Sequence, residues 1–205
     1  MARNQRRNQT ASSPQGGKGS NNLRIIAGQW RGRKLPFPDQ PGLRPTPDRV
    51  RETLFNWLQP TIEGAHCLDL FTGSGALGLE ALSRGAAEAT LIDSSKLVVQ
   101  QLHQNLTLLN AKNARLVLAS APQWLEQQQV ESARFDLVFL DPPFRQGMLE
   151  SCCRLLEQKA LLSERAQIYI EVERELKILD IPDNWQILRH KDSGQVSSYL
   201  CQRSD

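Results

Sequence analysis

The stretch CLDLFTGSGALGLEAL, residues 67–82, has the order of a buried strand, a glycine-rich loop and a helix. Gly73, Gly75 and Gly78 follow the spacing G-x-G-x-x-G, and glycines in such a loop let the backbone approach a ligand closely at a helix N-terminus. The spacing alone is weak, because a plain tight turn can supply one or two of these glycines. All three glycines between a strand and a helix predict a nucleotide-type binding site.

Outward from this stretch, apolar strand-like runs alternate with helical patterns. We expect strands at residues 66–70, 89–93, 115–119, 135–140, 167–172, 185–190 and 196–202. Helices are expected at residues 76–84, 95–109, 121–128 and 146–158. This alternation predicts an α/β fold whose sheet is mostly parallel, with helices on both faces. The last two strands are separated by the glycine-containing loop KDSGQVS (191–197), so they are expected to pair as an antiparallel hairpin.

The N-terminal part of the chain follows a different pattern. Residues 1–22 are rich in Gln, Asn, Ser, Gly and Arg and should be disordered, because they contain too little apolar surface to offset ordering entropy. LRIIAGQWRGRKL (23–35) predicts a β-hairpin, and LRPTPDRVRETLFNWL (43–58) predicts a helix with Thr46 as N-cap and Pro47 at its first position. Hence we expect a tail (1–22), an extension made of a hairpin and a helix (23–60) and a larger domain (61–205).

The net charge of +3 conceals an asymmetry. Residues 1–38 hold eight Lys or Arg and no acid, whereas the remainder holds 17 basic and 22 acidic residues. A basic arm on a mildly acidic body predicts a polyanionic partner, although a solubilising tail would have the same composition.

No run approaches the roughly 18 to 20 apolar residues of a membrane span. The four cysteines show no C-x-x-C pair, so we expect a cytoplasmic protein without metal.

Two aspartates are candidate ligand-binding residues. Asp93 ends the second expected strand, where a carboxylate can accept both hydroxyls of a ribose, but it could instead cap the next helix. Asp69 lies four residues before Gly73. A carboxylate there would repel the pyrophosphate of a nicotinamide cofactor but could hold an amine, so an oxidoreductase is the weakest interpretation.

The stretch FDLVFLDPPF, residues 135–144, places an acid at the end of an apolar strand. Pro142 and Pro143 keep the backbone extended behind Asp141, because a proline disfavours helix at the residue before it. The Asp141 carboxylate and the Pro142 carbonyl are then two fixed acceptors, with Phe144 as an aromatic plate beside them. Two acceptors suit a planar amine, and a stacking plate suits a flipped base. The plain alternative is a strand end, a turn and a buried Phe.

The segment DPPF matches the signature of amino-methyltransferases, and DLFTGSG resembles the first motif of S-adenosylmethionine-dependent methyltransferases. Together with RIIAGQWRGRKL and LRPTPDRVRETLFNWL, in this order and spacing, these motifs resemble the RsmD family of bacterial 16S rRNA guanine-N2 methyltransferases over residues 23–202. The resemblance implies a Rossmann-like seven-stranded class I methyltransferase sheet with a terminal antiparallel hairpin, preceded by an N-terminal hairpin and helix. It also implies methylation of guanine 966 of 16S rRNA, in an assembled or assembling 30S particle, by a monomer.

The same resemblance assigns roles to individual positions. The catalytic residues would be Asp141, Pro142, Pro143 and Phe144. The RNA-binding residues would be Arg24, Arg31, Arg33, Lys34, Arg44 and Thr46, whereas Arg49 and Arg51 are expected to be solvated helix residues. The S-adenosylmethionine site would comprise Asp69, Phe71, Gly73, Ser74, Gly75, Gly78, Asp93, Ser94, Ser120, Ala121 and Asp141. Ser120 departs from the family pattern, in which an acid commonly precedes the alanine that contacts adenine.

Other interpretations remain open at this point. One is an amino-methyltransferase for another amine, such as DNA adenine or a protein glutamine, although 205 residues leave no room for a separate target-recognition domain. Another is a non-catalytic RNA-binding assembly factor with the same fold. Tyr199 and Trp30 could stack on bases, but core packing explains them equally well.

Overall fold

The structure, a computed structural model, describes residues 21–43, 45–129, 135–176 and 179–204. The strands of its main sheet are β3 (His66–Asp69), β4 (Glu88–Asp93), β5 (Ala114–Leu118), β6 (Phe135–Leu140), β7 (Leu162–Glu173), β8 (Trp185–Ser193) and β9 (Val196–Arg203). A small sheet pairs β1 (Asn22–Arg24) with β2 (Lys34–Pro36). The helices are α1 (Asp48–Leu58), α2 (Gly78–Ser83), α3 (Lys96–Leu109), α4 (Ala121–Glu126) and α5 (Met148–Gln158).

The seven strands of the main sheet lie in the order β5-β4-β3-β6-β7-β9-β8. Strands β3 to β7 run parallel, and β9 runs antiparallel to both β7 and β8. This arrangement confirms the predicted α/β sheet with its terminal hairpin.

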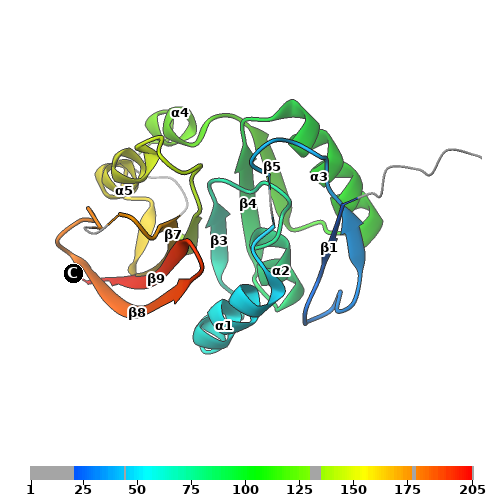
Figure 1. Cartoon of the computed structure of the whole chain (residues 1–205), viewed down its shortest axis with the longest axis horizontal. Helices are drawn as coiled ribbons and strands as arrows, with labels where there is room; N and C mark the ends of the chain where they lie inside the picture. The colour runs from blue at the N-terminus through cyan, green and yellow to red at the C-terminus, as the bar shows by residue number, and fades with distance from the viewer. Residues whose placement is uncertain (1–20, 44, 130–134, 177–178, 205) are drawn as a thin grey trace, which may run out of the picture.

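Helices cover both faces of the sheet, and each face has its own hydrophobic core (Figure 1). On one face, α1, α2, α3 and the β1–β2 hairpin pack through residues such as Phe55, Leu79 and Leu102. On the other face, α4 and α5 pack through residues such as Trp124 and Leu156. The strands buried between these layers are near-continuous apolar runs, as expected for parallel strands covered on both sides.

Strand β7 begins at Leu162, five residues before the predicted start. The polar stretch Ser163–Glu164–Arg165 lies outside the predicted strand (167–172). In the structure this stretch lies in β7, where the pairing with β6 shifts register between Phe135 and Leu137. Exposed polar residues at an irregular strand end do not alternate with apolar residues, so the two-residue hydrophobic periodicity of a strand does not detect them.

The N-terminal extension differs from the sequence prediction at three residues. Asn22, assigned to the tail, already belongs to β1, while residues 1–20 lie outside the described residues. Thr46 is not the N-cap of α1: Pro47 occupies that position, and no side chain caps the helix. Arg51 is not solvated either, because its side chain is completely buried.

Arg51 is buried because an ionic cluster surrounds it. Its guanidinium donates to Asp48 Oδ1 at 2.6 Å, to Glu80 Oε2 at 3.4 Å and to the carbonyl of Arg24 at 2.8 Å. Glu80 is also buried and accepts hydrogen bonds from Arg84 and from the N–H groups of Ile26 and Ala27. This cluster joins the hairpin, α1 and α2, so the extension is fixed against the larger domain.

Candidate active site at the carboxyl edge of the sheet

The strand order reverses direction between β3 and β6. From β3 the chain builds outward through β4 and β5, then returns to place β6 on the other side of β3. In open α/β sheets, ligands bind in the crevice at the carboxyl ends of the strands beside such a reversal. The glycine loop follows β3 and Asp141 follows the neighbouring parallel strand β6, so the structure brings the two predicted motifs to the same edge of the sheet.

The three glycines of the loop are required for different reasons. Gly73 and Gly75 have φ values of +53° and +84°, which side chains rarely adopt. Gly78 is the first residue of α2, and a Cβ there would lie 2.3 Å from Leu91 Cδ2 on β4. The first two glycines therefore shape the loop, and the third lets the helix pack closely on the sheet.

Asp69 lies beneath this loop rather than in the open crevice. Its side chain is buried, and Oδ2 accepts a hydrogen bond from the Gly78 N–H at 3.0 Å. Burial raises the pKa of Asp69 to about 7, while hydrogen bonds from the Gly78 and Phe71 N–H groups oppose the shift. Such a carboxyl group favours a bound cation by its charge and at the same time holds the loop in place.

Asp93 lies at the end of β4 and braces the same loop. Its Oδ2 accepts from the Gly73 N–H at 2.9 Å, and its Oδ1 accepts from the Ser95 N–H at 2.7 Å. The N-cap of α3 is Ser95, whose hydroxyl accepts from the Val98 N–H, so Asp93 is not the N-cap. A carboxylate has about four acceptor positions, which leaves two at Asp93 for the hydroxyls of a ribose.

The remaining predicted cofactor residues lie at the ends of the same strands. Ser74 is buried in the loop, Phe71 is half-buried, and Ser94 is exposed after β4. Ser120 precedes α4 and donates its hydroxyl proton to Gln123 Oε1 at 2.9 Å. Because that proton is directed to Gln123, the Ser120 oxygen is left as an acceptor, with the buried Ala121 next to it.

Asp141 follows the last residue of β6 and is half-buried. Burial raises its pKa well above the ordinary value, and the charges of Glu171 and Asp69 add to the shift. Pro142 is buried behind it, while Phe144 is 41% exposed. The plain alternative, in which Phe144 is a core residue, does not fit this exposure.

A hydroxyl and carboxyl cluster beside Asp141 was missed by the sequence analysis. Glu171 on β7 is buried, and its Oε1 accepts from the Tyr169 hydroxyl at 2.8 Å. The hydroxyl of Thr46 is also hydrogen-bonded to this carboxyl group. The sequence does contain a sign of Glu171: it is an acid inside the apolar run IYIEV, near the end of the strand expected to follow the DPPF strand.

Residues between β2 and α1 cross the carboxyl edge of the sheet. Gln40 exchanges side-chain hydrogen bonds with Ser95, and Leu43 lies so close to Gly73 that a Cβ there would be 2.9 Å from Leu43 Cδ1. Thr46 then reaches Glu171. This part of the extension therefore passes from the start of α3, over the glycine loop, to the end of β7.

The predicted RNA-binding residues fall into two groups. Arg31, Arg33 and Lys34 are exposed on the hairpin, although Arg33 also donates to the Leu108 carbonyl at 3.2 Å. Arg24 is exposed too and pairs with Asp48 at 2.9 Å. Thr46 is buried at the active site, and Arg44 lies outside the described residues.

The two aromatic residues considered as base-stacking candidates both pack against the core. Trp30 is half-buried against the core of α1, α2 and α3. Tyr199 lies against the opposite core and stacks on His190, with ring centroids 4.4 Å apart.

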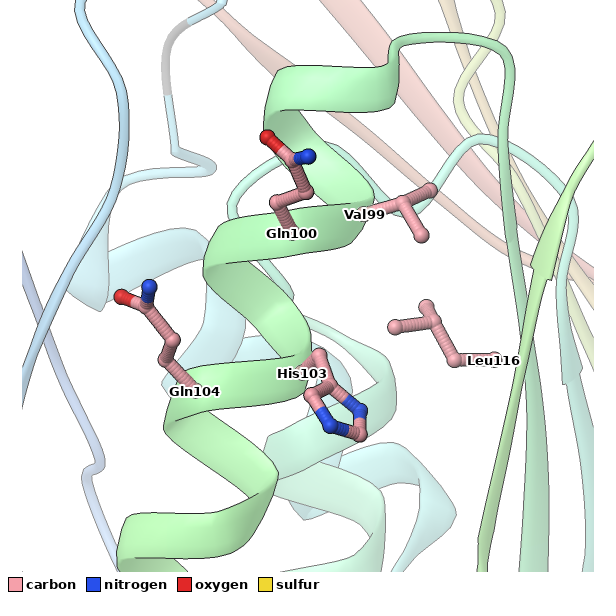
Figure 2. Close-up of a pocket in the computed structure, with 5 residues that line it drawn as sticks. All are labelled: Val99, Gln100, His103, Gln104 and Leu116. Carbon is pink, nitrogen blue, oxygen red and sulfur yellow. The ribbon is translucent and has the colours of Figure 1, made fainter.

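A separate groove of about 630 Å³ lies between α3 and β5, lined by Val99, Gln100, His103, Gln104 and Leu116 (Figure 2). It holds no acid and none of the predicted site residues, so we do not assign it to the active site. In the described part of the chain, no group of His, Cys, Asp or Glu could hold a metal ion. The helices described here include none that is long and apolar enough to cross a membrane.

The sheet order, the glycine loop and the DPPF segment together define a class I methyltransferase. The chain belongs to the family described as Conserved hypothetical protein 95, whose model matches residues 23–202. This membership confirms the resemblance to the RsmD family.

Individual relatives cover nearly the whole chain. Ribosomal RNA small subunit methyltransferase D of Escherichia coli K12 is 56% identical over 185 residues, covering 90% of this chain and 92% of its own length. The Haemophilus influenzae protein of the same name is 48% identical over 182 residues, covering 88% and 93%. Among solved structures, the putative methyltransferase yhhF from Escherichia coli has a TM-score of 0.82 at 54% identity, covering 90% of this chain and 99% of its own.

Proposed function

We propose that this enzyme methylates the exocyclic N2 amine of one guanine in 16S ribosomal RNA, at guanine 966 by family resemblance, with S-adenosylmethionine as methyl donor. The substrate class is supported by relatives that are small subunit rRNA methyltransferases and share about half of their residues with this chain. The choice of an amine is supported by the acceptors at the end of β6.

The residues at the crevice fit the methyl donor. Asp93 has acceptor positions left for a ribose, the Ser120 oxygen can accept from an adenine amine, and Asp69 supplies negative charge beneath the loop. S-adenosylmethionine would supply a methyl group on a sulfonium: the C–S electron pair would stay on sulfur, the N2 lone pair would form the new bond, and N2 would lose one proton to the Asp141 carboxylate or to water. The protein residues bind and orient the reactants for this transfer.

The position of Asp141 and Pro142 is the single observation that carries the proposal. Asp141 leaves β6 beside the loop that follows β3, and Pro142 fixes the backbone so that its carbonyl is a second acceptor. An amine on a purine is a weak nucleophile because its lone pair is delocalised into the ring. Two acceptors that hold both hydrogens out of the ring plane localise that lone pair and aim it, which is catalysis by positioning and electrostatics.

The charges of the site suit this reaction. Burial raises the pKa values of Asp69, Asp141 and Glu171, and the charges of Glu171 and Asp69 raise the pKa of Asp141 further. A cationic methyl donor and a nitrogen that becomes cationic would both relieve this repulsion. Phe144, exposed beside Asp141, offers a face on which a flipped base can stack.

The RNA would be held by the extension. Arg31, Arg33 and Lys34 on the hairpin, with the basic residues of the tail, form the positive arm that meets phosphates. In this proposal residues 1–22 act as a basic tail, 23–60 as the RNA-contacting extension and 61–205 as the methyltransferase domain. The protein acts as a cytoplasmic monomer on a small-subunit particle.

Product analysis tests the proposed function. Labelled S-adenosylmethionine is supplied with free 16S rRNA, 30S particles from cells lacking the enzyme, naked DNA and a glutamine-containing protein. We expect N2-methylguanosine from the RNA substrates, with the particle as the better one. Label in adenine, in a ring nitrogen or in protein would contradict the assignment of the guanine amine, and no transfer at all would favour an assembly factor.

A further inference from the structure

Glu171 occupies the position next to Asp141 on the neighbouring strand. Strands β6 and β7 are parallel, and Leu140 pairs with Ile170, so Asp141 and Glu171 follow at the same edge. The charge of Glu171 contributes to the raised pKa of Asp141, as expected for two neighbouring carboxyl groups. The mechanism proposed above uses the charge of this second acid but assigns it no contact with the base.

The carboxyl group of Glu171 is held from two sides. The Tyr169 hydroxyl donates to Oε1 at 2.8 Å, and the Tyr169 ring is fully buried with its edge against Phe139. The Thr46 hydroxyl bonds to the same carboxyl group, and Thr46 is itself held by Arg51 Nε, which donates to its carbonyl at 3.1 Å. Two of about four acceptor positions are thus occupied, and the orientation of the others is fixed.

Glu171 has no cationic partner in the part of the chain that the structure describes. The described ion pairs involve Asp48, Glu80, Glu88, Glu157, Glu175 and Asp192, but not this residue. A buried carboxylate that is held by two hydroxyls but paired with no cation is costly in its charged form, and a ligand that donates a hydrogen bond to it lowers that cost. In the proposed complex, the group nearest to Glu171 is the base whose amine Asp141 and Pro142 would hold.

Guanine and adenine differ at the atom adjacent to the amine. Guanine carries an N1–H donor next to its N2 amine, whereas adenine carries an N1 lone pair next to its N6 amine. A carboxylate oxygen beside the amine therefore accepts from guanine N1–H and repels adenine N1. A buried polar group that loses its partner discriminates strongly against the wrong substrate.

We propose that Glu171, oriented by Tyr169 and Thr46, accepts a hydrogen bond from N1–H of the target base and makes the site select guanine. This inference rests on the proposed function, because it assumes that the neighbouring amine is N2 of guanine. Glu171 contacts the base directly, whereas Tyr169 and Thr46 act through it and are positioning residues.

The test compares two bases that both carry the N2 amine. Small-subunit particles are reconstituted with 16S rRNA that has either guanine or 2-aminopurine at the methylated position. 2-Aminopurine keeps the amine but has an N1 lone pair in place of N1–H. The wild-type protein should methylate the guanine particle with a kcat/KM roughly 10- to 100-fold higher, the range for one hydrogen bond to a charged group.

Glu171→Gln should remove most of this preference. The amide oxygen of the glutamine still accepts from Tyr169, so its N–H group faces the base. That N–H group opposes the N1–H donor of guanine, but it can donate a hydrogen bond to the N1 lone pair of 2-aminopurine. Tyr169→Phe should reduce the preference partly, because the carboxyl group is kept but loses one orienting hydroxyl. Glu164→Gln, which removes an exposed charge from the other end of β7, is the matched control and should leave the preference unchanged.

The outcomes separate the inference from the function. A wild-type protein that methylates both particles equally would leave the methyltransferase assignment intact and overturn the role of Glu171, whether or not any variant folds. A folded Glu171→Gln protein that keeps the full preference would overturn it as well. Failure of the wild type to form N2-methylguanosine on the guanine particle would instead contradict the proposed function.

Discussion

At the scale of single residues, Asp141 is the position on which the proposed chemistry depends. Asp141→Ala should leave S-adenosylmethionine binding nearly intact and lower kcat by about 100-fold or more, because the lost interaction is needed in the transition state. Asp141→Asn should keep a small residual rate, since one acceptor oxygen remains without its charge. Single-turnover kinetics with calorimetry of cofactor binding measures both quantities. Wild-type turnover in the alanine variant would refute the mechanism.

Asp93 is the residue whose effect should appear in binding. Asp93→Ala should weaken S-adenosylmethionine binding by about 1.5 to 3 kcal/mol, because a charge-assisted pair of hydrogen bonds to the ribose is lost. Since Asp93 also accepts from Gly73 and Ser95, Asp93→Asn is the control that keeps one acceptor at the loop. Isothermal titration calorimetry gives the affinities. Unchanged affinity in Asp93→Ala would place the ribose elsewhere.

At the scale of elements, the ionic cluster around Arg51 fixes α1 to α2. Arg51→Met should lower the free energy of unfolding by about 3 to 5 kcal/mol, because Glu80 would be left buried with less compensation. Arg49→Met, an exposed change on the same helix, should stay within about 0.5 kcal/mol. Urea denaturation monitored by tryptophan fluorescence compares them. Equal stability of the two variants would show that the cluster contributes little.

The elements that sequence predicted well are those with a strong local pattern. The apolar run before Asp141 gave β6 with its observed bounds, and α3 was predicted within one residue because Ser95 and the Leu/Val periodicity mark it. Strand β7 was predicted short, because its first residues are polar. Local sequence patterns detect an element through its own periodicity, so ends that depend on pairing with another strand escape them.

The errors at the site have a tertiary origin. Arg51 has the composition of a solvated helix residue, but Glu80, 29 residues away, makes its burial possible. Thr46 was expected to cap its own helix, but its hydroxyl binds Glu171 on a distant strand. Glu171 can be recognised as a neighbour of Asp141 only when β7 is placed beside β6. The motif residues could be recognised from the sequence, whereas the contacts of Arg51, Thr46 and Glu171 become visible only in the folded structure.

At the scale of the whole molecule, charge distribution should govern RNA binding. Deleting residues 2–20 removes Arg3, Arg6, Arg7 and Lys18. If all four meet phosphates, the slope of the log–log dependence of affinity on salt concentration should decrease by about 2.8 to 3.6, at about 0.7 to 0.9 per contact. Methyl transfer on bound substrate should change little. Filter binding at several salt concentrations is the measurement, and an unchanged slope would identify the tail as solubilising.

The buried acids should also set how stability depends on pH. Asp69 has its pKa raised from 3.8 to about 7, so between these values the folded protein binds more protons than the unfolded chain. Its contribution to stability is therefore present at low pH and is lost as pH rises toward about 7. Asp141 and Glu171 act in the same direction. The urea concentration at the midpoint of unfolding should fall as pH rises from about 5 to 8. It should fall less steeply in Asp69→Asn than in the wild type. Equal slopes in the two proteins would contradict the raised pKa of Asp69.

The hydrogen bonds that Glu80 accepts have a consequence for how the chain can be divided. Glu80 lies in α2, but its carboxylate accepts from the backbone of Ile26 and Ala27 and from Arg51, as well as from Arg84. A fragment beginning at residue 61 would keep this acid in its interior and retain only Arg84 among these donors. The proposed boundary near residue 60 would therefore divide roles along the polypeptide without dividing folding units, and we expect residues 61–205 to fold only together with the extension.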